Sequence, residues 1–282
     1  MTSSPAPEVP RAEIGVIGGS GFYSFLDDAR PVEVTTPFGP PSEPPVVGLV
    51  AGRPVAFVPR HGRDHRLAPH RVEYRANLWA LRAVGVRQVL APCAVGSLRP
   101  ELGPGTVVVP DQVVDRTTGR APTVYDGQDA RAGHVVHVGF AAPVCPGGRA
   151  AVLAAGRERG ADPVDGGTLV VVNGPRFSSR AESQWHAAAG WSLVGMTAMP
   201  EAAIARELAM CFTTIALVTD HDAGVEGGPA VSHAEVLEVF GRNVESLKGL
   251  VADAAAALPA EGEGGCGCRD ALEGQRLPFE LP

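Results

Sequence analysis

The stretch SLVGMTAMPEAAIARELAMCFTTIALVTD, residues 192–220, alternates between two kinds of pattern. Short apolar runs at residues 192–196 and 213–219 predict buried strands, and the segment 200–210 between them has the length and spacing of a helix. A strand, a helix and a second strand in this order form the unit from which α/β sheets are built. This stretch therefore predicts an α/β fold.

The same alternation extends along the rest of the chain. Further strands are predicted at residues 14–17, 46–50, 55–58, 86–91 and 168–172, and further helices at residues 70–84, 148–158, 179–189 and 232–258. The last helix has Ser232 as its expected N-cap and Glu235 at the capping-box position. Its apolar stripe consists of Val236, Leu237, Phe240, Val244, Leu247 and Leu250. We expect one domain with a central mixed β-sheet flanked by helices.

The composition is ordinary for a globular protein. Hydrophobic residues make up 45% of the 282 residues and charged residues 20%, and no change of composition divides the chain near its middle. We expect a flexible N-terminus over residues 1–11, a single domain over residues 12–258 and a tail over residues 259–282. The tail is rich in Gly, Glu and Cys, and we expect it to be loosely ordered unless a neighbouring subunit holds it.

Charge and hydropathy exclude several kinds of partner. The 24 Lys and Arg residues against 31 Asp and Glu give a net charge of −7, so no general basic field is available for nucleic acid. No apolar run has the roughly 18–20 residues of a membrane helix, and the first ten residues lack the pattern of a signal peptide, so we expect a cytoplasmic protein. The five cysteines are odd in number and mostly scattered, which favours free thiols, with Cys266-Gly267-Cys268 as the one candidate pair.

A glycine-rich loop, Gly18-Gly19-Ser20-Gly21, follows the first predicted strand. Its backbone N–H groups and hydroxyl could bind an anion, although a tight turn would use the same residues. The dinucleotide-binding fingerprint fails because Ser24 stands where its last glycine should be, and the esterase elbow fails because Phe22 stands in place of the closing glycine. The loop disfavours a nicotinamide oxidoreductase and gives no support to a serine hydrolase.

Arg60 and His61 follow the second strand of the predicted hairpin. A guanidinium offers a planar fork for phosphate and an imidazole a further donor, but a surface Arg beside a satisfied His is the commoner occurrence of such a pair. A metal site at His61, His65 and His70 lacks the HExxH pattern and any carboxylate at ligand spacing, so no metal is expected.

Asp220 and Asp222 close an apolar strand, where an α/β sheet presents its working groups. Two close carboxylates can raise each other's pKa, so that one stays protonated and donates to a purine nitrogen, but paired acids at a strand end also cap helices. Phe177 could offer an aromatic face to a base, or could belong to the core.

Together these segments resemble the trimeric purine nucleoside phosphorylases and, within that family, the 5'-methylthioadenosine phosphorylases. The resemblance runs from Ile14 to about Leu258. It rests on seven ordered motifs: Ile17-Gly18-Gly19-Ser20-Gly21; Pro59-Arg60-His61-Gly62; Gly96-Ser97-Leu98-Arg99; Pro110-Asp111-Gln112; residues 174–183 (GPRFSSRAES); Gly195-Met196-Thr197 with Pro200-Glu201; and Thr219-Asp220-His221-Asp222.

The resemblance implies a purine nucleoside phosphorylase-like three-layer fold and assigns site residues. Those that bind phosphate are Ser20, Arg60, His61, Cys93 and Ala94 through their backbone, and Thr197. Those that bind the nucleoside are Phe177, Ser178, Met196, Asp220, Asp222, His233, Leu237 and, from the adjacent subunit of a homotrimer, His137.

The resemblance also implies the reaction. Inorganic phosphate splits a 6-aminopurine nucleoside, most simply 5'-methylthioadenosine, into adenine and 5-methylthioribose-1-phosphate, with Asp220 and Asp222 as the catalytic acids and no metal or organic cofactor. A carboxylate at position 220 suits a 6-amino group, whereas relatives acting on 6-oxopurines carry Asn there.

Three alternatives stay open. His233 stands where methylthioadenosine enzymes have a small apolar residue, which leaves room for a phosphorylase acting on adenosine, inosine or another 5'-substituted nucleoside. The other two are a nucleosidase that uses water and a purine-binding protein without catalysis.

Overall fold

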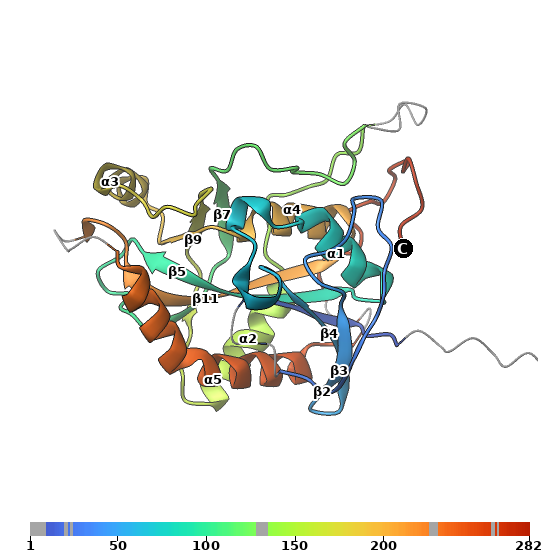
Figure 1. Ribbon diagram of the computed structural model, residues 1–282, viewed down its shortest axis with the longest axis horizontal. Coiled ribbons are helices and arrows are strands. Elements are labelled where there is room, and N and C mark those ends of the chain that lie inside the picture. Colours follow the sequence, from blue (N-terminus) through green and yellow to red (C-terminus); the bar gives the residue numbers. More distant parts are fainter. Residues whose placement is uncertain are drawn as a thin grey trace, which may run out of the picture.

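The computed structural model describes residues 10–19, 22, 25–127, 135–225, 231–260, 263 and 265–282, which form a mixed β-sheet with helices on both faces (Figure 1). The strands are β1 (Ile14–Gly18), β2 (Asp27–Pro31), β3 (Val46–Val50), β4 (Arg53–Pro59), β5 (Gln88–Ser97), β6 (Val107–Val109), β7 (Gln112–Asp115), β8 (Val164–Asp165), β9 (Thr168–Val171), β10 (Leu193–Gly195) and β11 (Cys211–His221). The helices are α1 (Tyr74–Ala83), α2 (Pro146–Glu158), α3 (Arg180–Ala188), α4 (Ala198–Glu207) and α5 (His233–Ala257), with short 3-10 turns at Arg63–His65 and Pro69–Arg71.

Two apolar clusters, one on each face of the sheet, define three layers. On one face α1 and α4 pack together, and their Leu78, Leu81 and Ile204 belong to the larger cluster. On the other face α2 and α5 cross below the sheet (Figure 1), and Val152 and Leu250 belong to the second cluster. The predicted α/β fold, with one mixed sheet covered on both sides, is confirmed.

The predicted elements are present, with ends shifted by a few residues. The apolar runs that suggested strands became β1, β3, β4, β5, β9, β10 and β11, and the five predicted helices became α1 to α5. The short strands β2, β6, β7 and β8 were not predicted. They are two to five residues long, and β2 and β8 are exposed at every residue, so no buried apolar run marks these two strands.

The predicted capping box of the last helix is wrong. Ser232 is the N-cap of α5, but its side chain makes no capping hydrogen bond. The capping box occurs instead at α3, where the Ser179 hydroxyl accepts from Glu182 N–H and the Glu182 carboxylate accepts from Ser179 N–H. The Glu182 carboxylate also binds Arg176, and this contact, followed by the Ser179 N–H, lowers the pKa of Glu182 to about 2.

The strand β5 changes partner halfway along one of its edges. Residues 88–90 pair in parallel with β1, and Gly96 and Ser97 pair with antiparallel β10. Between these segments, residues 91–95 have no strand partner on this edge within the described part of the chain, while β11 pairs along the whole other edge. A gap therefore opens in the sheet beside the middle of β5.

The tail packs against its own chain, although the sequence led us to expect a loosely ordered segment. The Phe279 ring lies 5.5 Å from that of Trp79 and 5.2 Å from that of Tyr125, and Arg269 pairs with Glu13. Aromatic burial of this kind offsets the entropy lost on ordering the chain end. The expected flexible N-terminus lies outside the described residues, apart from Pro10 and Arg11.

Within the described residues, no helix combines the length and the apolar character that crossing a membrane requires.

Two leucines of the predicted apolar stripe of α5 differ strongly in burial. Leu247 is 2% exposed, whereas Leu237, ten residues earlier on the same helix, is 56% exposed. We predict that Leu247→Ala lowers the free energy of unfolding by about 2–5 kcal/mol because it leaves a cavity, and that Leu237→Ala changes it by less than about 0.5 kcal/mol. Urea unfolding followed by circular dichroism measures both values, and equal losses would contradict the prediction.

Candidate active site

A cavity of about 290 Å³ lies at the gap beside β5. Residues 92–96 of β5 line it, so the cavity occupies the edge where the strand has no partner. Alternate backbone groups of a strand point to opposite edges, and the Pro92 carbonyl accepts a hydrogen bond from Arg60 on this side. The N–H group of Ala94, two residues on, therefore also faces the gap.

The structure brings most of the predicted site residues into this one cavity. Its lining includes Arg60, His61, Cys93, Ala94, Phe177, Ser178, Met196, Thr197, Asp220, Asp222, His233 and Leu237. Ser20 lies outside the described residues, although its neighbour Gly19 lines the cavity. His137 does not line it; this exposed residue accepts a hydrogen bond at its carbonyl from Gln275.

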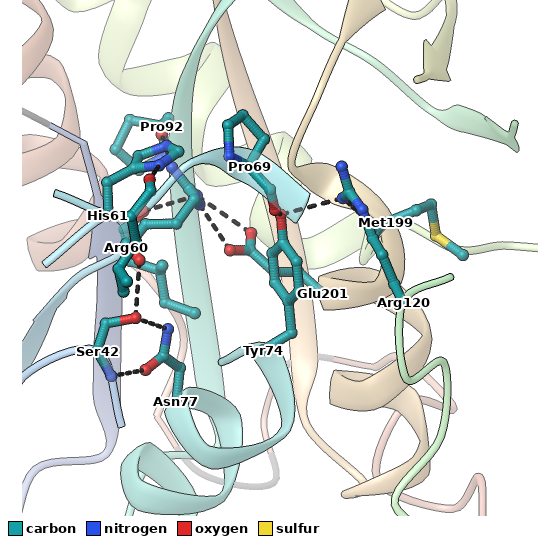
Figure 2. Close-up of polar contacts among 12 residues, drawn as sticks. Ser42, Arg60, His61, Pro69, Tyr74, Asn77, Pro92, Arg120, Met199 and Glu201 are labelled. Carbon is teal, nitrogen blue, oxygen red and sulfur yellow. Dashed lines mark hydrogen bonds and ion pairs between the residues drawn. The ribbon is translucent and has the colours of Figure 1, made fainter. Parts of the chain in front are cut away.

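Arg60 is buried at the floor of the site and pairs with Glu201 of α4 (Figure 2). Its Nε and Nη2 donate to the two Glu201 carboxylate oxygens at 2.6 and 3.1 Å, Nη1 donates to the Pro92 carbonyl and Nη2 to the Ile17 carbonyl. Four of its five N–H groups thus have partners among the described residues, and one on Nη1 is left for a ligand. Burial alone would lower the pKa of Arg60, but the Glu201 carboxylate reverses this effect and raises it.

The backbone that carries Arg60 is held from the opposite side. Ser42 Oγ donates to the Arg60 carbonyl at 2.8 Å, and Asn77 of α1 binds both the N–H and the hydroxyl of Ser42 (Figure 2). Arg60 is therefore fixed at its side chain by α4 and at its backbone by α1. A group held in this way is pre-organised for an incoming anion.

His61 is a neutral imidazole with a defined tautomer. Its Nδ1 lies 2.8 Å from the Leu67 carbonyl, which can only accept, so Nδ1 carries the proton and Nε2 is an acceptor. Burial, followed by the positive charge of Arg60, lowers the pKa of His61 to about 3. The ring stacks on His65 at 4.2 Å between centroids. With this tautomer Nε2 can accept a hydrogen bond but cannot donate one, which differs from the predicted role of His61 as a donor.

Two further groups border this part of the cavity. Thr197 is the N-cap of α4, yet its side chain makes no capping hydrogen bond, which leaves the hydroxyl for the cavity. Burial raises the pKa of the Cys93 thiol to about 12, so it stays uncharged and does not repel an anion.

A β-bulge places the acidic residues. The register of β11 against β5 shifts between Val218 and Asp220, so that Asp220 pairs with Gly96. Bulges of this kind redirect side chains beside active sites. A Cβ atom at Gly96 would lie 3.1 Å from Asp220 Oδ2, so only glycine leaves the carboxyl group ordinary room here. The bulge was not predictable from an apolar run without interruption.

The two carboxyl groups have different environments. Burial raises the pKa of Asp220 to about 6; Thr219 donates to Oδ1 at 2.8 Å and opposes this shift, while the charge of Asp222 adds to it. Asp222 is 3% exposed, and its Oδ2 accepts a hydrogen bond from Ser183 of α3. Asp220 is therefore the group that can exchange a proton near neutral pH, and Asp222 is the anchored one.

The rest of the lining is largely apolar and includes residues that were not predicted for the site. Val236, Phe240 and the predicted Leu237 project from the first turns of α5; Leu237 is exposed, whereas Phe240 also packs against the second apolar cluster. His65 and Pro69 come from the 3-10 turns after β4. Glu201, the carboxylate partner of Arg60, was part of a sequence motif but was assigned no role. The sequence could not suggest the pair, because the two residues are 141 positions apart.

We predict that Glu201→Gln lowers the free energy of unfolding by about 3–5 kcal/mol, because it leaves the buried guanidinium without its counter-charge. The matched control is Glu238→Gln in the exposed Arg242–Glu238 pair, for which a loss below about 1 kcal/mol is expected. Denaturant titration measures the free energy of unfolding of both variants. Similar losses would show that the buried Arg60–Glu201 pair contributes no more to stability than the exposed Arg242–Glu238 pair.

Comparison with known proteins agrees with this geometry. A model of the phosphorylase superfamily matches residues 13–256. The purine nucleoside phosphorylase of Streptomyces coelicolor is 64% identical over 275 residues, covering 96% of this chain and 98% of that protein. The S-methyl-5'-thioadenosine phosphorylase of Mycolicibacterium smegmatis is 54% identical over 272 residues, covering 95% and 99%.

A solved structure of methylthioadenosine phosphorylase from Schistosoma mansoni in complex with adenine superposes with a TM-score of 0.82 at 36% identity, over 89% of this chain and 93% of that one. The match in sequence and in fold extends over nearly the whole chain. This chain belongs to the phosphorylase superfamily and, within it, to the group of purine nucleoside and methylthioadenosine phosphorylases.

Proposed function

We propose that the protein catalyses the phosphorolysis of 5'-methylthioadenosine to adenine and 5-methylthioribose-1-phosphate. The observation that carries the proposal is the arrangement of one cavity, with donors for an anion beside Pro92 and a carboxyl group of raised pKa beside Gly96. These two positions on β5 are about 13 Å apart along the strand. A sugar fits between a phosphate at one end and a base at the other.

Phosphate binds at the Arg60 end. The remaining N–H of Arg60, the Ala94 N–H and the Thr197 hydroxyl donate to its oxygens, while His61 Nε2 accepts from the P–OH group. The bound dianion lies beneath C1' and stabilises the positive charge that develops on the sugar as the glycosidic bond lengthens. The C1'–N9 bond breaks and a C1'–O bond to phosphate forms, so the nucleophile is the co-substrate and no metal or organic cofactor takes part.

Asp220 acts as the general acid for the leaving base. In its protonated form it donates to N7 as negative charge develops on the purine, and its other oxygen accepts from the 6-amino group. Burial raises the pKa of Asp220, and the nearby Asp222, anchored by Ser183, adds to this shift. Phe177 and Ser178 border the base, and Met196 lies along the ribose.

The 5' substituent meets a largely apolar wall. Val236, Leu237 and Phe240 of α5 suit a methylthio group. Burial, followed by the charges of His233 and Arg60, lowers the pKa of His65, so this ring is neutral as well. The second candidate, a phosphorylase of adenosine or inosine, is favoured by His233 in the lining and by the name of the Streptomyces relative.

We further propose a homotrimer in the cytoplasm. His137 is exposed and lies outside the cavity of its own chain, as expected if it completes the 5' pocket of an adjacent subunit.

The reaction is tested by release of free base from 5'-methylthioadenosine, adenosine and inosine, with and without phosphate and in the presence of a chelator. We expect phosphate-dependent release of adenine, fastest with methylthioadenosine, because the wall of α5 is apolar. Turnover without phosphate would overturn the proposal in favour of a nucleosidase, and faster turnover of inosine would identify the second candidate.

We predict that Asp220→Asn lowers kcat/KM for methylthioadenosine by about 10²–10⁴-fold, the usual effect of losing a general acid, while the loss for inosine is much smaller because an amide suits a 6-oxo group. Steady-state kinetics on both substrates give the ratio. An unchanged ratio would remove Asp220 from base recognition.

The raised pKa of Asp220 sets a pH dependence. Above pH 6 the protonated fraction of Asp220 falls about tenfold for each pH unit, so kcat/KM for methylthioadenosine should decline with a slope approaching −1. In Asp220→Asn this limb should be absent, because the amide does not titrate. The same limb in the variant would show that the decline does not come from Asp220.

A further inference from the structure

Four of the five cysteines converge at a place that none of the proposed chemistry uses. Cys145 is the N-cap of α2, Cys211 is the first residue of β11, and Cys266 and Cys268 belong to the tail. Their sulfur atoms all lie within 4.8 Å of one another, and none of the four lines the active-site cavity. We call these four residues the cysteine cluster.

The cysteine cluster is distinctive within the described part of the chain. It is the one group of three or more His, Cys, Asp or Glu side chains there whose ligand atoms converge in this way. Cys145, Cys211 and Cys268 are each at most 5% exposed. Sequence reasoning singled out only Cys266 and Cys268, because the other two lie more than 50 residues away.

The distances fit a tetrahedral ion. With Zn–S bonds of about 2.3 Å, two sulfur ligands of one zinc ion lie about 3.8 Å apart. Cys211 Sγ and Cys266 Sγ are 3.4 Å apart, and the most distant pair has to approach by about 1 Å to reach the ideal edge. A disulfide joins sulfurs in pairs at about 2.05 Å. A group in which every sulfur lies near the other three suits one central ion better than two separate bridges.

The surroundings offer hydrogen-bond donors and positive charge to the sulfur atoms. The Gly148 N–H at the start of α2 donates to Cys145. The N-terminus of a helix also carries partial positive charge. Arg206 Nη2 donates to Cys268 Sγ at 3.7 Å. Hydrogen-bond donors to the sulfur ligands are a usual feature of metal sites.

We propose that the cysteine cluster is a structural zinc site. Binding one Zn²⁺ releases the four thiol protons and gives a tetrathiolate complex of net charge −2, which the α2 N-terminus and Arg206 stabilise. The ion joins the tail to α2 and β11. Further along the tail, Phe279 makes its contacts with Trp79 and Tyr125. Its role is to hold the chain end, and it takes no part in the reaction.

The first test is elemental analysis of the full-length protein, purified without chelator. We expect about one zinc per chain, released by a mercurial thiol reagent, and a lower Tm after the release. In the cobalt-exchanged protein, intense thiolate-to-cobalt charge transfer and tetrahedral d–d bands should appear. Absence of bound metal in protein expressed with zinc would overturn the proposal.

The second test separates zinc from disulfides. Under denaturing conditions with chelator and without reductant, the zinc site predicts five titratable thiols per chain, whereas one disulfide would leave three and two would leave one. Cys266→Ser should lose the zinc, and Cys93→Ser, outside the cluster, should keep it. Fewer than five thiols, or zinc retained in Cys266→Ser, would contradict the proposal. Because the cobalt spectrum is recorded on the unmutated sequence, the result stands even if Cys266→Ser fails to fold.

Discussion

The buried pair of Arg60 and Glu201 is the interaction on which the rest of the site depends. A guanidinium without solvent needs a counter-charge and hydrogen bonds for nearly all its N–H groups, and here they come from β1, β5 and α4. The pair therefore joins α4 to β1 and β5 at the point where the sheet is open. Removing any one of its partners would leave a buried charge with too few hydrogen bonds.

Burial favours the uncharged form of side chains at both ends of the cavity, with a different consequence at each end. At the Arg60 end, burial favours neutral His61 and a neutral Cys93 thiol, so the positive charge of the guanidinium is not diluted by neighbouring cations or opposed by an ionised thiol. At the Asp220 end, burial retains a proton on a carboxyl group that would lose it in water. The same physical cause thus prepares one end for an anion and the other for proton donation.

Much of the fold could be predicted from the sequence because its strands are buried and its helices amphipathic, as β11 and α1 illustrate. The predicted site residues also met in one cavity, except for Ser20, which is not described, and His137. Features that depend on distant parts of the chain could not be predicted: the role of Glu201, the bulge that directs Asp220, and the convergence of Cys145 and Cys211 with the tail. The capping box was misplaced because Ser-x-x-Glu occurs at both Ser179 and Ser232, and only packing decides which one forms.

Two leucines of α5 belong to different parts of the molecule, one to the cavity and one to the core. Leu237 borders the cavity but contributes little to the core, whereas Leu247 does the reverse. Under the proposed function, a substitution at Leu237 changes the fit of the 5' substituent with little effect on the core. Relatives that share more than half of this sequence and carry different substrate names are the outcome that such a division would produce.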